Sequence, residues 1–286
     1  MATFYNQATL SYNGIVKASN ITSGEIMSAV SVTKTPVSAE YSTGSSVTYI
    51  VNIVNSGSVC YENCTLTDDL GMYAYGVPKA DVVPLTYEED TAKVFVNGVL
   101  QTGVSVTGLS PLTITGINIP AGGNASVVYS AAPNEYAPLG EGGEITNTAE
   151  VSGTGFTPVS ASAAVSAENA AELDIVKSLS PAAVEENGQV TYTFEIRNTG
   201  TAPVTADDTA VFTDTFDPVL TSLTATYNGT PWTAGTNYTY DTATGIFTTA
   251  DGQITVPAAA ASQDTSSGVW SVTPGVSTLV ITGNIS

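Results

Sequence analysis

The chain has 286 residues, with 26 acidic side chains against 6 basic ones and no histidine, so its formal net charge is −20. A surface this acidic repels phosphate backbones and anionic lipids, which argues against nucleic-acid and membrane partners. Without histidine there is no Ser-His-Asp or Cys-His group and no His-ligated metal. We therefore expect no enzyme active site, no metal, no cofactor and no small-molecule substrate.

Composition and the first residues bear on where such a chain works. Charged residues make up 11% of it, against roughly 25% in an average globular domain. The hydrophobic fraction of 42% supplies the cores of about two ordinary domains. No apolar run approaches the ~20 residues of a membrane span, and the start, MATFYNQATLSYNG, lacks the features of a secretory signal peptide.

Taken in chain order, the predicted elements are short β-strands. They are runs rich in Val, Ile, Thr and Tyr in which apolar and polar positions nearly alternate, and NG, SG, TG and PAGG turn signals bound them. The clearest of these runs are residues 45–57, 92–98, 112–119, 191–200 and 277–285. Many short strands at this spacing predict an all-β fold of immunoglobulin-like β-sandwiches.

Comparing the chain with itself reveals two copies of one pattern. Residues 32–57 match residues 175–200 without a gap. The polar residues that pair are Lys34 with Lys177, at an offset of 143, and Asp68 with Asp214, at an offset of 146. The predicted organisation is an N-terminal donor-strand extension (1–27), a first sandwich (28–168) and a second, strand-deficient sandwich (169–286).

The second copy is expected to lack its closing strand. We align LTITG (112–116) with LVITG (279–283), after which the first copy continues to a closing strand at 144–153 and the second reaches Ser286. The missing segment matches the start of the chain, where residues 3–14 align with residues 144–155 and Asn6 aligns with Asn147. The N-terminus therefore has the pattern of the last strand of a sandwich.

A sandwich without its final strand exposes unpaired backbone groups beside an apolar groove, and a free strand of matching alternation relieves this by strand addition. The inward-facing positions of the predicted donor strand are Phe4, Asn6, Ala8 and Leu10. Donation from one subunit to the next gives an open, head-to-tail homopolymer. The residues leave open whether the strand acts between chains or folds back into its own second sandwich.

Three polar residues of each sandwich fall in phase with apolar neighbours, since side chains at i and i+2 share a face. They are Lys34, Asp68 and Asn147 for the first sandwich, and Lys177, Asp214 and Asn6 for the second. Burial lowers the pKa of a lysine and raises that of a carboxylic acid. A neutral amine is a nucleophile, and a protonated carboxyl can polarise an asparagine amide.

Loss of ammonia from such a trio would leave a Lys–Asn isopeptide bond. The bond would form within one chain in the first sandwich, and between Lys177 and the Asn6 of a neighbouring subunit in the second. The residues equally allow a buried Lys–Asp ion pair capped by Asn, or a lysine that reaches solvent at a strand end.

The two cysteines, Cys60 and Cys64, lie close together in CYENC. A metal site would need two more ligands, which the sequence does not group nearby. A local or intersubunit disulfide and a pair of free thiols are both open.

The segments VSVTKTPVSAEYSTGSSVTYIVNIVNSG, LTDDL and ITNTAEV resemble the bacterial surface repeat called domain of unknown function eleven, and also isopeptide-forming fimbrial domains and collagen-adhesin-type modules. In those isopeptide modules the lysine comes from the first strand, the asparagine from the last and the acid from a middle strand. The resemblance implies these roles for Lys34, Asn147 and Asp68, and for Lys177, Asn6 and Asp214.

The overall layout is similar to that of clostridial spore-appendage subunits of about this mass, 29.2 kDa. The resemblance implies an extracellular location on a bacterial spore or cell surface. It also accounts for a start without a signal peptide, because spore-coat components are made inside the mother cell. The predicted function is a structural subunit of a self-assembling filament or ribbon. The alternative from another class is a monomeric adhesin that binds a ligand through its loops.

Overall fold

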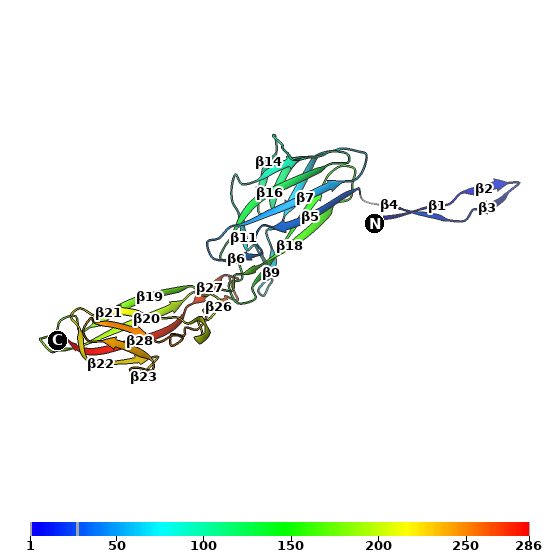
Figure 1. Ribbon diagram of the computed structural model, residues 1–286. Coiled ribbons are helices and arrows are strands. Elements are labelled where there is room, and N and C mark those ends of the chain that lie inside the picture. The colour runs from blue at the N-terminus through cyan, green and yellow to red at the C-terminus, as the bar shows by residue number, and fades with distance from the viewer. Residues whose placement is uncertain (1, 27–28, 286) are drawn as a thin grey trace.

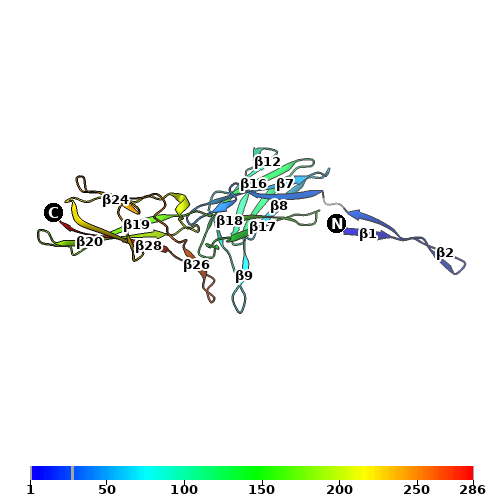
Figure 2. The same cartoon turned by 60° about the horizontal axis from the view of Figure 1, so that its bottom comes forward.

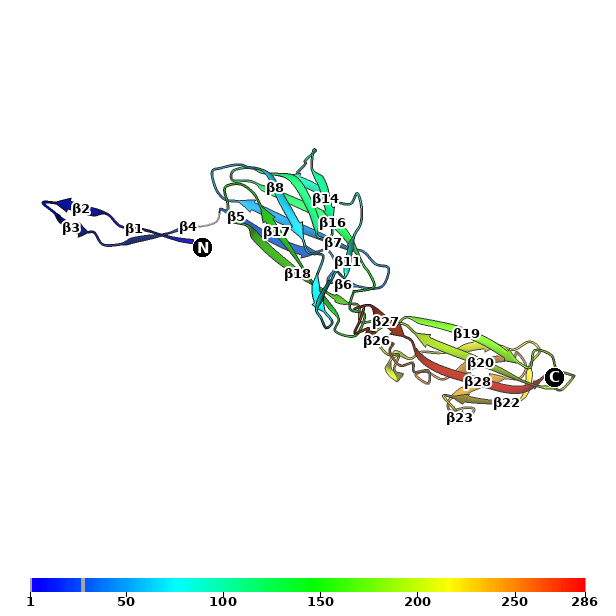
Figure 3. The ribbon, with the colours of Figure 1, turned by 180° about the vertical axis from the view of Figure 1, so that it is seen from behind.

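The computed structural model describes residues 2–26 and 29–285. Over these residues the regular structure is β, apart from one short 3-10 helix, η1 (Ala206–Asp208), and the expectation of an all-β fold is confirmed. Figures 1 and 3 show an N-terminal β-ribbon, a first sandwich and a second sandwich following one another in a row. The ribbon lies on the far side of the first sandwich from the second.

The N-terminal ribbon is a long two-stranded hairpin. Its strands are β1 (Ala2–Asn6), β2 (Thr9–Tyr12), β3 (Ile15–Ala18) and β4 (Thr22–Ile26). β1 pairs with β4 and β2 with β3, both antiparallel. Asn13 and Gly14 connect β2 to β3 and both have positive φ, 45° and 77°, as a two-residue hairpin turn that follows the strand twist requires.

The first sandwich packs two six-stranded sheets face to face. One sheet has β5 (Val30–Pro36), β7 (Val47–Asn55), β16 (Asn124–Pro133), β12 (Lys93–Val96) and β13 (Val99–Leu100) in this order, with β11 (Leu85–Tyr87) also on β16. The other has β14 (Ser105–Leu109), β15 (Leu112–Ile119), β8 (Tyr61–Asp68), β17 (Glu144–Ser152), β18 (Val159–Ala167) and β6 (Glu40–Tyr41).

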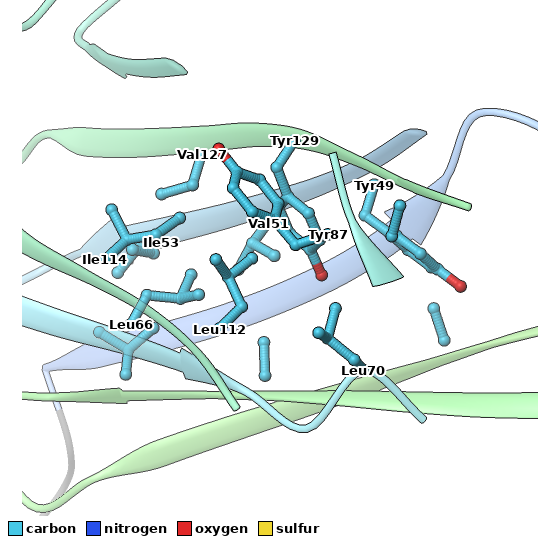
Figure 4. Close-up of a cluster of buried hydrophobic side chains, with 14 of the residues drawn as sticks. Tyr49, Val51, Ile53, Leu66, Leu70, Tyr87, Leu112, Ile114, Val127 and Tyr129 are labelled. Atoms are coloured by element: carbon cyan, nitrogen blue, oxygen red, sulfur yellow. The ribbon is translucent and has the colours of Figure 1, made fainter. Parts of the chain in front are cut away.

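The core of the first sandwich lies between its sheets and follows from strict alternation. In β7, Val47, Tyr49, Val51 and Ile53 are fully buried, while the residues between them are more exposed. Side chains of both sheets meet in this layer, as Figure 4 shows for Tyr49 and neighbouring residues. The period of two is what a strand with one buried face demands.

The second sandwich is smaller. Its larger, five-stranded sheet has β19 (Leu173–Ser180), β20 (Gln189–Asn198), β28 (Gly275–Ile285), β22 (Leu220–Tyr227) and β23 (Thr230–Trp232) in this order. Its three-stranded sheet has β21 (Thr213–Thr215), β25 (Ile246–Thr249) and β24 (Tyr238–Asp241). A separate cluster of buried residues, among them Phe194, Phe247 and Ile281, forms its core.

The strand order corrects one alignment made from the sequence. Residues 279–283 belong to β28, which pairs with β20 as β16 pairs with β7. They therefore correspond to residues 127–131, and the counterpart of LTITG (112–116) begins in β25, which pairs with β21 as β15 pairs with β8. The alignment failed because alternating Thr and aliphatic residues suit any half-buried strand and carry no information on which strand it is.

The smaller sheet of the second sandwich ends early. In the first sandwich the order β14, β15, β8 continues with β17, β18 and β6. In the second, the matching order β24, β25, β21 stops at β21 within the described residues. One edge of β21 therefore has no strand beside it, at the place where β8 is paired with β17.

Two short hairpins lie where the sandwiches meet. They are β9 (Tyr73–Tyr75) with β10 (Ala80–Val82) from the first sandwich, and β26 (Ala260–Gln263) with β27 (Trp270–Thr273) from the second. Figure 2 shows both projecting from this region. Gln263 Nε2 donates to the Tyr73 hydroxyl at 2.7 Å, and the Trp270 backbone N–H donates to the Glu135 carbonyl at 2.8 Å. These bonds tie the two sandwiches of one chain together.

Candidate functional site

A lysine, an aspartate and an asparagine meet in the core of the first sandwich. β5 carries Lys34, the end of β8 carries Asp68 and the middle of β17 carries Asn147. Each sits at an inward position of its strand, so the apolar alternation that builds the core also aims these polar groups into it. All three are buried, and the side chains of Lys34 and Asp68 are 0% exposed.

The polar atoms of this cluster form one hydrogen-bonded chain. Lys34 Nζ lies 2.6 Å from Asp68 Oδ2, and the Tyr129 hydroxyl donates to the same oxygen. Asn147 Nδ2 donates to the Tyr129 oxygen at 3.3 Å. The other Asp68 oxygen accepts the Leu70 backbone N–H at 3.0 Å. The Asn147 carbonyl oxygen, in contrast, has no hydrogen-bond partner among the described residues.

Burial dominates the electrostatics of the cluster. It lowers the pKa of the Lys34 ammonium below its ordinary value, although the charge of Asp68 and its hydrogen bond oppose the shift. Burial also raises the pKa values of the Tyr49 and Tyr129 phenols, so both stay protonated at neutral pH. Burial therefore makes deprotonation of the Lys34 ammonium easier than in water.

Two aromatic rings lie close to the Lys34 ammonium. Lys34 Nζ is 4.7 Å from the centre of the Tyr49 ring and 5.9 Å from that of Tyr129. The two rings stack with their centres 5.6 Å apart, and Figure 4 shows both in the buried layer with Leu70 and Leu112. Their faces favour a cation, but the surroundings exclude the water that would otherwise solvate it.

The second sandwich repeats the ion pair in a different environment. Lys177 Nζ lies 2.6 Å from Asp214 Oδ2, yet the two side chains are 44% and 19% exposed. Three rings approach the ammonium, at 4.9 to 5.5 Å from their centres: those of Tyr192, Phe194 and Phe216. An exposed pair of this kind is worth ~0–1 kcal/mol, because solvent and salt screen it.

The strand that carries Lys177, β19, is exposed to solvent along its whole length. Every residue of β19 is exposed, including the apolar Leu173 and Ile175, at 47% and 49%. Val30, which matches Leu173 in β5, is 2% exposed. In the first sandwich β17 and β18 complete the layer over this face, whereas no described strand does so in the second.

The structure does not bring Asn6 to Lys177. Asn6 lies on β1 of the ribbon, and the four predicted donor positions Phe4, Asn6, Ala8 and Leu10 are all exposed. The donor segment is also more than the single strand predicted from residues 3–14, because β3 and β4 pair with it. An isolated two-stranded hairpin in water is marginally stable.

The β1–β4 half of the ribbon has the same pairing register as the β17–β18 hairpin. In the β2–β3 half, where Leu10 lies opposite Lys17, the register shifts by one residue. Asn147 lies opposite Ala163, and Asn6 lies opposite Thr22. Asn6 and Thr22 thus precede Asn147 and Ala163 by the same 141 residues. The apolar alternation also agrees, since Phe4 and Leu10 match the buried Ile145 and Val151 by the same offset. The β1–β4 half of the ribbon therefore repeats the pairing of the β17–β18 hairpin, and its strand 3–14 repeats the apolar alternation.

One substitution between ribbon and hairpin conserves shape. The Ile145–Val165 pair of the hairpin corresponds to Phe4–Gly24 of the ribbon. The Phe4 ring covers Gly24 so closely that a Cβ added to this glycine would lie 2.5 Å from the ring. A large ring over a glycine replaces two aliphatic side chains, which keeps the inward face filled.

Sequence reasoning missed Tyr129, which joins Asp68 to Asn147. Its signal was available, because Tyr129 stands in phase with the inward-facing Val127 and Ala131. Its position opposite Tyr49 depends on the pairing of β16 with β7, which local sequence does not specify. At the matching position of β28, opposite Tyr192, the second sandwich has Ile281.

Both cysteines are free thiols, so the local disulfide considered above is not present. Cys60 is exposed just before β8, whereas Cys64 is buried within that strand. Residues four apart in an extended strand are separated by ~13 Å, beyond the reach of a disulfide. Burial raises the pKa of the Cys64 thiol.

Neither a metal site nor a membrane-spanning helix is found in the described part of the chain. No group of three or more Cys, Asp or Glu side chains there is placed to hold a metal ion. No helix within residues 2–26 and 29–285 has the length and apolar character to cross a membrane.

The chain matches no protein-family model and no curated protein. Among solved structures it is similar to the pilus backbone protein of Streptococcus pneumoniae, with 12% identity, 86% of this chain and 55% of that one covered, and a TM-score of 0.33. A form of the major pilin subunit of Bacillus cereus gives 10% identity, 96% and 73% coverage and a TM-score of 0.38.

The collagen-binding domain of a Staphylococcus aureus adhesin gives 15% identity, 51% and 100% coverage and a TM-score of 0.30. The chain spans about half the length of the pneumococcal backbone protein. Likenesses at these identities and scores concern β-sandwich architecture, and no function follows from them.

Proposed function

We propose that the chain is a structural subunit of an extracellular filament, in which the N-terminal ribbon of one subunit completes the second sandwich of the next. The observation that carries this proposal is the register that the β1–β4 pair shares with the β17–β18 hairpin, in which Asn6 matches Asn147. We infer a bacterial spore or cell surface as its location from the resemblance to spore-appendage subunits.

The free edge of β21 specifies how the ribbon would add. In the first sandwich Ala149 lies opposite Asp68, and Val151 lies opposite Leu66. The same pairing between subunits puts Ala8 opposite Asp214 and Leu10 opposite Phe212. Main-chain hydrogen bonds along this edge would supply affinity, and the alternating side chains would set the register.

Apolar burial supplies the driving force. Phe4 and Leu10 are 54% and 66% exposed on the ribbon, and Leu173, Ile175 and Leu179 are 43% to 49% exposed on β19. Covering each of these side chains contributes up to ~1.5–3 kcal/mol. The ribbon and the second sandwich each expose an apolar face that the other can cover.

The reach of the connecting segment argues against insertion of the ribbon into its own second sandwich. The ribbon precedes β5, which begins at Val30 at one end of the first sandwich. The chain leaves for the second sandwich after β18, at the other end (Figure 1). Four peptide units separate Ile26 from Val30 and span at most ~14 Å. The nine residues of β7 alone are ~30 Å long. This supports another copy of the chain as the partner.

The contact is head to tail and does not close on itself. A subunit offers the ribbon at one end and the β21 edge at the other, and these surfaces differ, so repetition produces an open filament. Each sandwich along it is completed by a hairpin that immediately precedes the following sandwich. Junctions within and between subunits then share one plan.

We further propose that Lys–Asn bonds lock this assembly, within the chain at Lys34 and Asn147 and between chains at Lys177 and Asn6. The lysine Nζ would bond to the asparagine Cγ while the Cγ–Nδ2 bond breaks and ammonia leaves. Asp68 and Asp214 would assist, because each lies 2.6 Å from its lysine. Docking of the ribbon would give Lys177 and Asp214 the dry surroundings that Lys34 and Asp68 already have.

Electron microscopy of the purified full chain and of a variant that lacks residues 2–26 tests the assembly. The full chain should form filaments and the variant should stay monomeric. Adding an excess of the variant to the full chain should shorten the filaments, because its intact β21 edge accepts a ribbon and it offers none in return. Filaments formed by the variant, or a full chain that stays monomeric as an adhesin would, contradict the proposal.

A further inference from the structure

One difference between the two lysine sites is the phenol of Tyr129. In the first sandwich the Tyr129 hydroxyl lies between Asp68 Oδ2, to which it donates, and Asn147 Nδ2, from which it accepts at 3.3 Å. At the matching position the second sandwich has Ile281, which is buried and offers no polar atom. The sites therefore share the lysine and the acid but not the group that joins them to the amide.

Bond formation at the first site needs proton transfer in both directions. The Lys34 ammonium has three protons, of which one remains on the new amide nitrogen and two must leave. The departing Nδ2 of Asn147 has two protons and must gain two, so that the product is ammonium. The amine lone pair forms the Nζ–Cγ bond, and the Cγ–Nδ2 electron pair leaves with nitrogen.

Asp68 can take a proton from Lys34 directly, but none of the hydrogen bonds of the described residues links Asp68 to Asn147. The side chains of Lys34 and Asp68 are 0% exposed, so bulk water cannot carry protons across this gap. In the part of the chain that the structure describes, the Tyr129 hydroxyl is the one group hydrogen-bonded to both Asp68 and Asn147.

We propose that Tyr129 relays protons from Asp68 to the leaving nitrogen of Asn147. The hydroxyl gives its proton to Nδ2 and takes one back from the carboxyl, so it is unchanged after each transfer. This role rests on the isopeptide bond of the proposed function. Burial favours the neutral phenol, which keeps this proton available.

The relay predicts different rates at the two sites. The first site has the phenol, and its isopeptide bond should form soon after folding. The second has Ile281 in its place, so the interchain bond should form more slowly after docking. A slow interchain step would let subunits add reversibly before a covalent bond joins them. The bond within the first sandwich would form earlier, while the subunit is still a monomer.

Intact-mass spectrometry of denatured protein tests the relay, in the full chain with Lys177→Ala to remove the interchain bond. The fraction of chains that have lost one ammonia is followed from purification onward. Tyr129→Phe keeps the ring and removes the hydroxyl, and should slow the loss by ~10²-fold, the lower end of what a positioned proton-transfer group supplies. Tyr41→Phe is the matched control, since it removes another buried phenol of the same core, hydrogen-bonded to the Pro138 carbonyl.

Equal rates for Tyr129→Phe and Tyr41→Phe would overturn the relay while leaving the bond itself intact. If the parent chain loses no ammonia, the isopeptide bond is absent and the relay with it. A second variant keeps the relay testable if Tyr129→Phe does not fold. Ile281→Tyr, in an otherwise native chain, adds the phenol to the second site and should speed the appearance of covalent dimers after assembly starts. An unchanged rate in assembled Ile281→Tyr filaments would count against the relay.

Discussion

Lys34 and Lys177 hold matching positions in the two sandwiches, and each lies 2.6 Å from an aspartate. Their surroundings differ, because the side chain of Lys34 is 0% exposed and that of Lys177 is 44% exposed. Nothing in the first strands accounts for this, since both lysines occur in the same matched segment. The difference comes from β17 and β18, which complete the first sandwich and have no described counterpart in the second.

The comparison teaches that one strand pattern can occur both inside a sandwich and outside it. The ribbon keeps the apolar alternation and the asparagine of the β17–β18 hairpin, and its β1–β4 half keeps the register. It lies before the first sandwich instead of after the second. Parallel changes in the two sandwiches, and on the two faces of the ribbon, test this comparison.

The largest contrast is expected for the covalent link between subunits. Boiled filaments should run as a ladder on a denaturing gel, and Lys177→Ala should collapse the ladder to the monomer. Lys34→Ala should leave it in place, because Lys34 bonds within its own chain. A single monomer band from native filaments, or a ladder that persists in Lys177→Ala, would refute the interchain bond.

Removing the aspartate should lower the unfolding free energy of the two sandwiches by amounts that differ by several kcal/mol. Asp68→Ala leaves Lys34 buried without its partner and should destabilise the first sandwich by ~3–5 kcal/mol. Asp214→Ala breaks an exposed pair and should cost the unassembled chain ~0–1 kcal/mol. Urea unfolding that resolves the transition of each sandwich measures both, and similar losses would show that the environments do not differ as described.

The ribbon face should matter for assembly by a smaller amount. Leu10→Ala removes a side chain that docking would bury and should weaken subunit addition by ~1.5–3 kcal/mol. The critical concentration for filaments should then rise by roughly 10- to 100-fold. Ser11→Ala, on the opposite face, should change it little. Sedimentation of filaments over a concentration series gives the values, and equal effects of the two changes would argue against this docking face.

The smallest contrast is expected at a motif that both sandwiches complete. Asn55 Nδ2 donates to the Val59 and Pro120 carbonyls at 2.7 and 3.0 Å. Asn198 does the same to Ala202 and Pro257 at 2.7 and 3.1 Å. Changing either asparagine to alanine should cost ~1–3 kcal/mol, with little difference between the two. A much smaller loss for Asn198 would mean that the second sandwich is loose throughout and not only at its open edge.

Much of the fold follows from the sequence because alternation and turn residues act locally. The strand character of residues 47–55 and the inward phase of Lys34, Asp68 and Asn147 need only a period of two. The same periodicity revealed the match between ribbon and hairpin, since the two segments align without a gap over residues 3–14.

Which strands become neighbours is decided by tertiary structure. The alignment of residues 279–283 with LTITG failed because strands of the two facing sheets share one alternating pattern, and only the pairing of β28 with β20 distinguishes them. Tyr129 was missed for the same reason, since its place beside Asp68 depends on the two sheets facing each other. The solvent around Lys177 also depends on tertiary structure, because exposure is set by strands distant in sequence and not by the residues beside it.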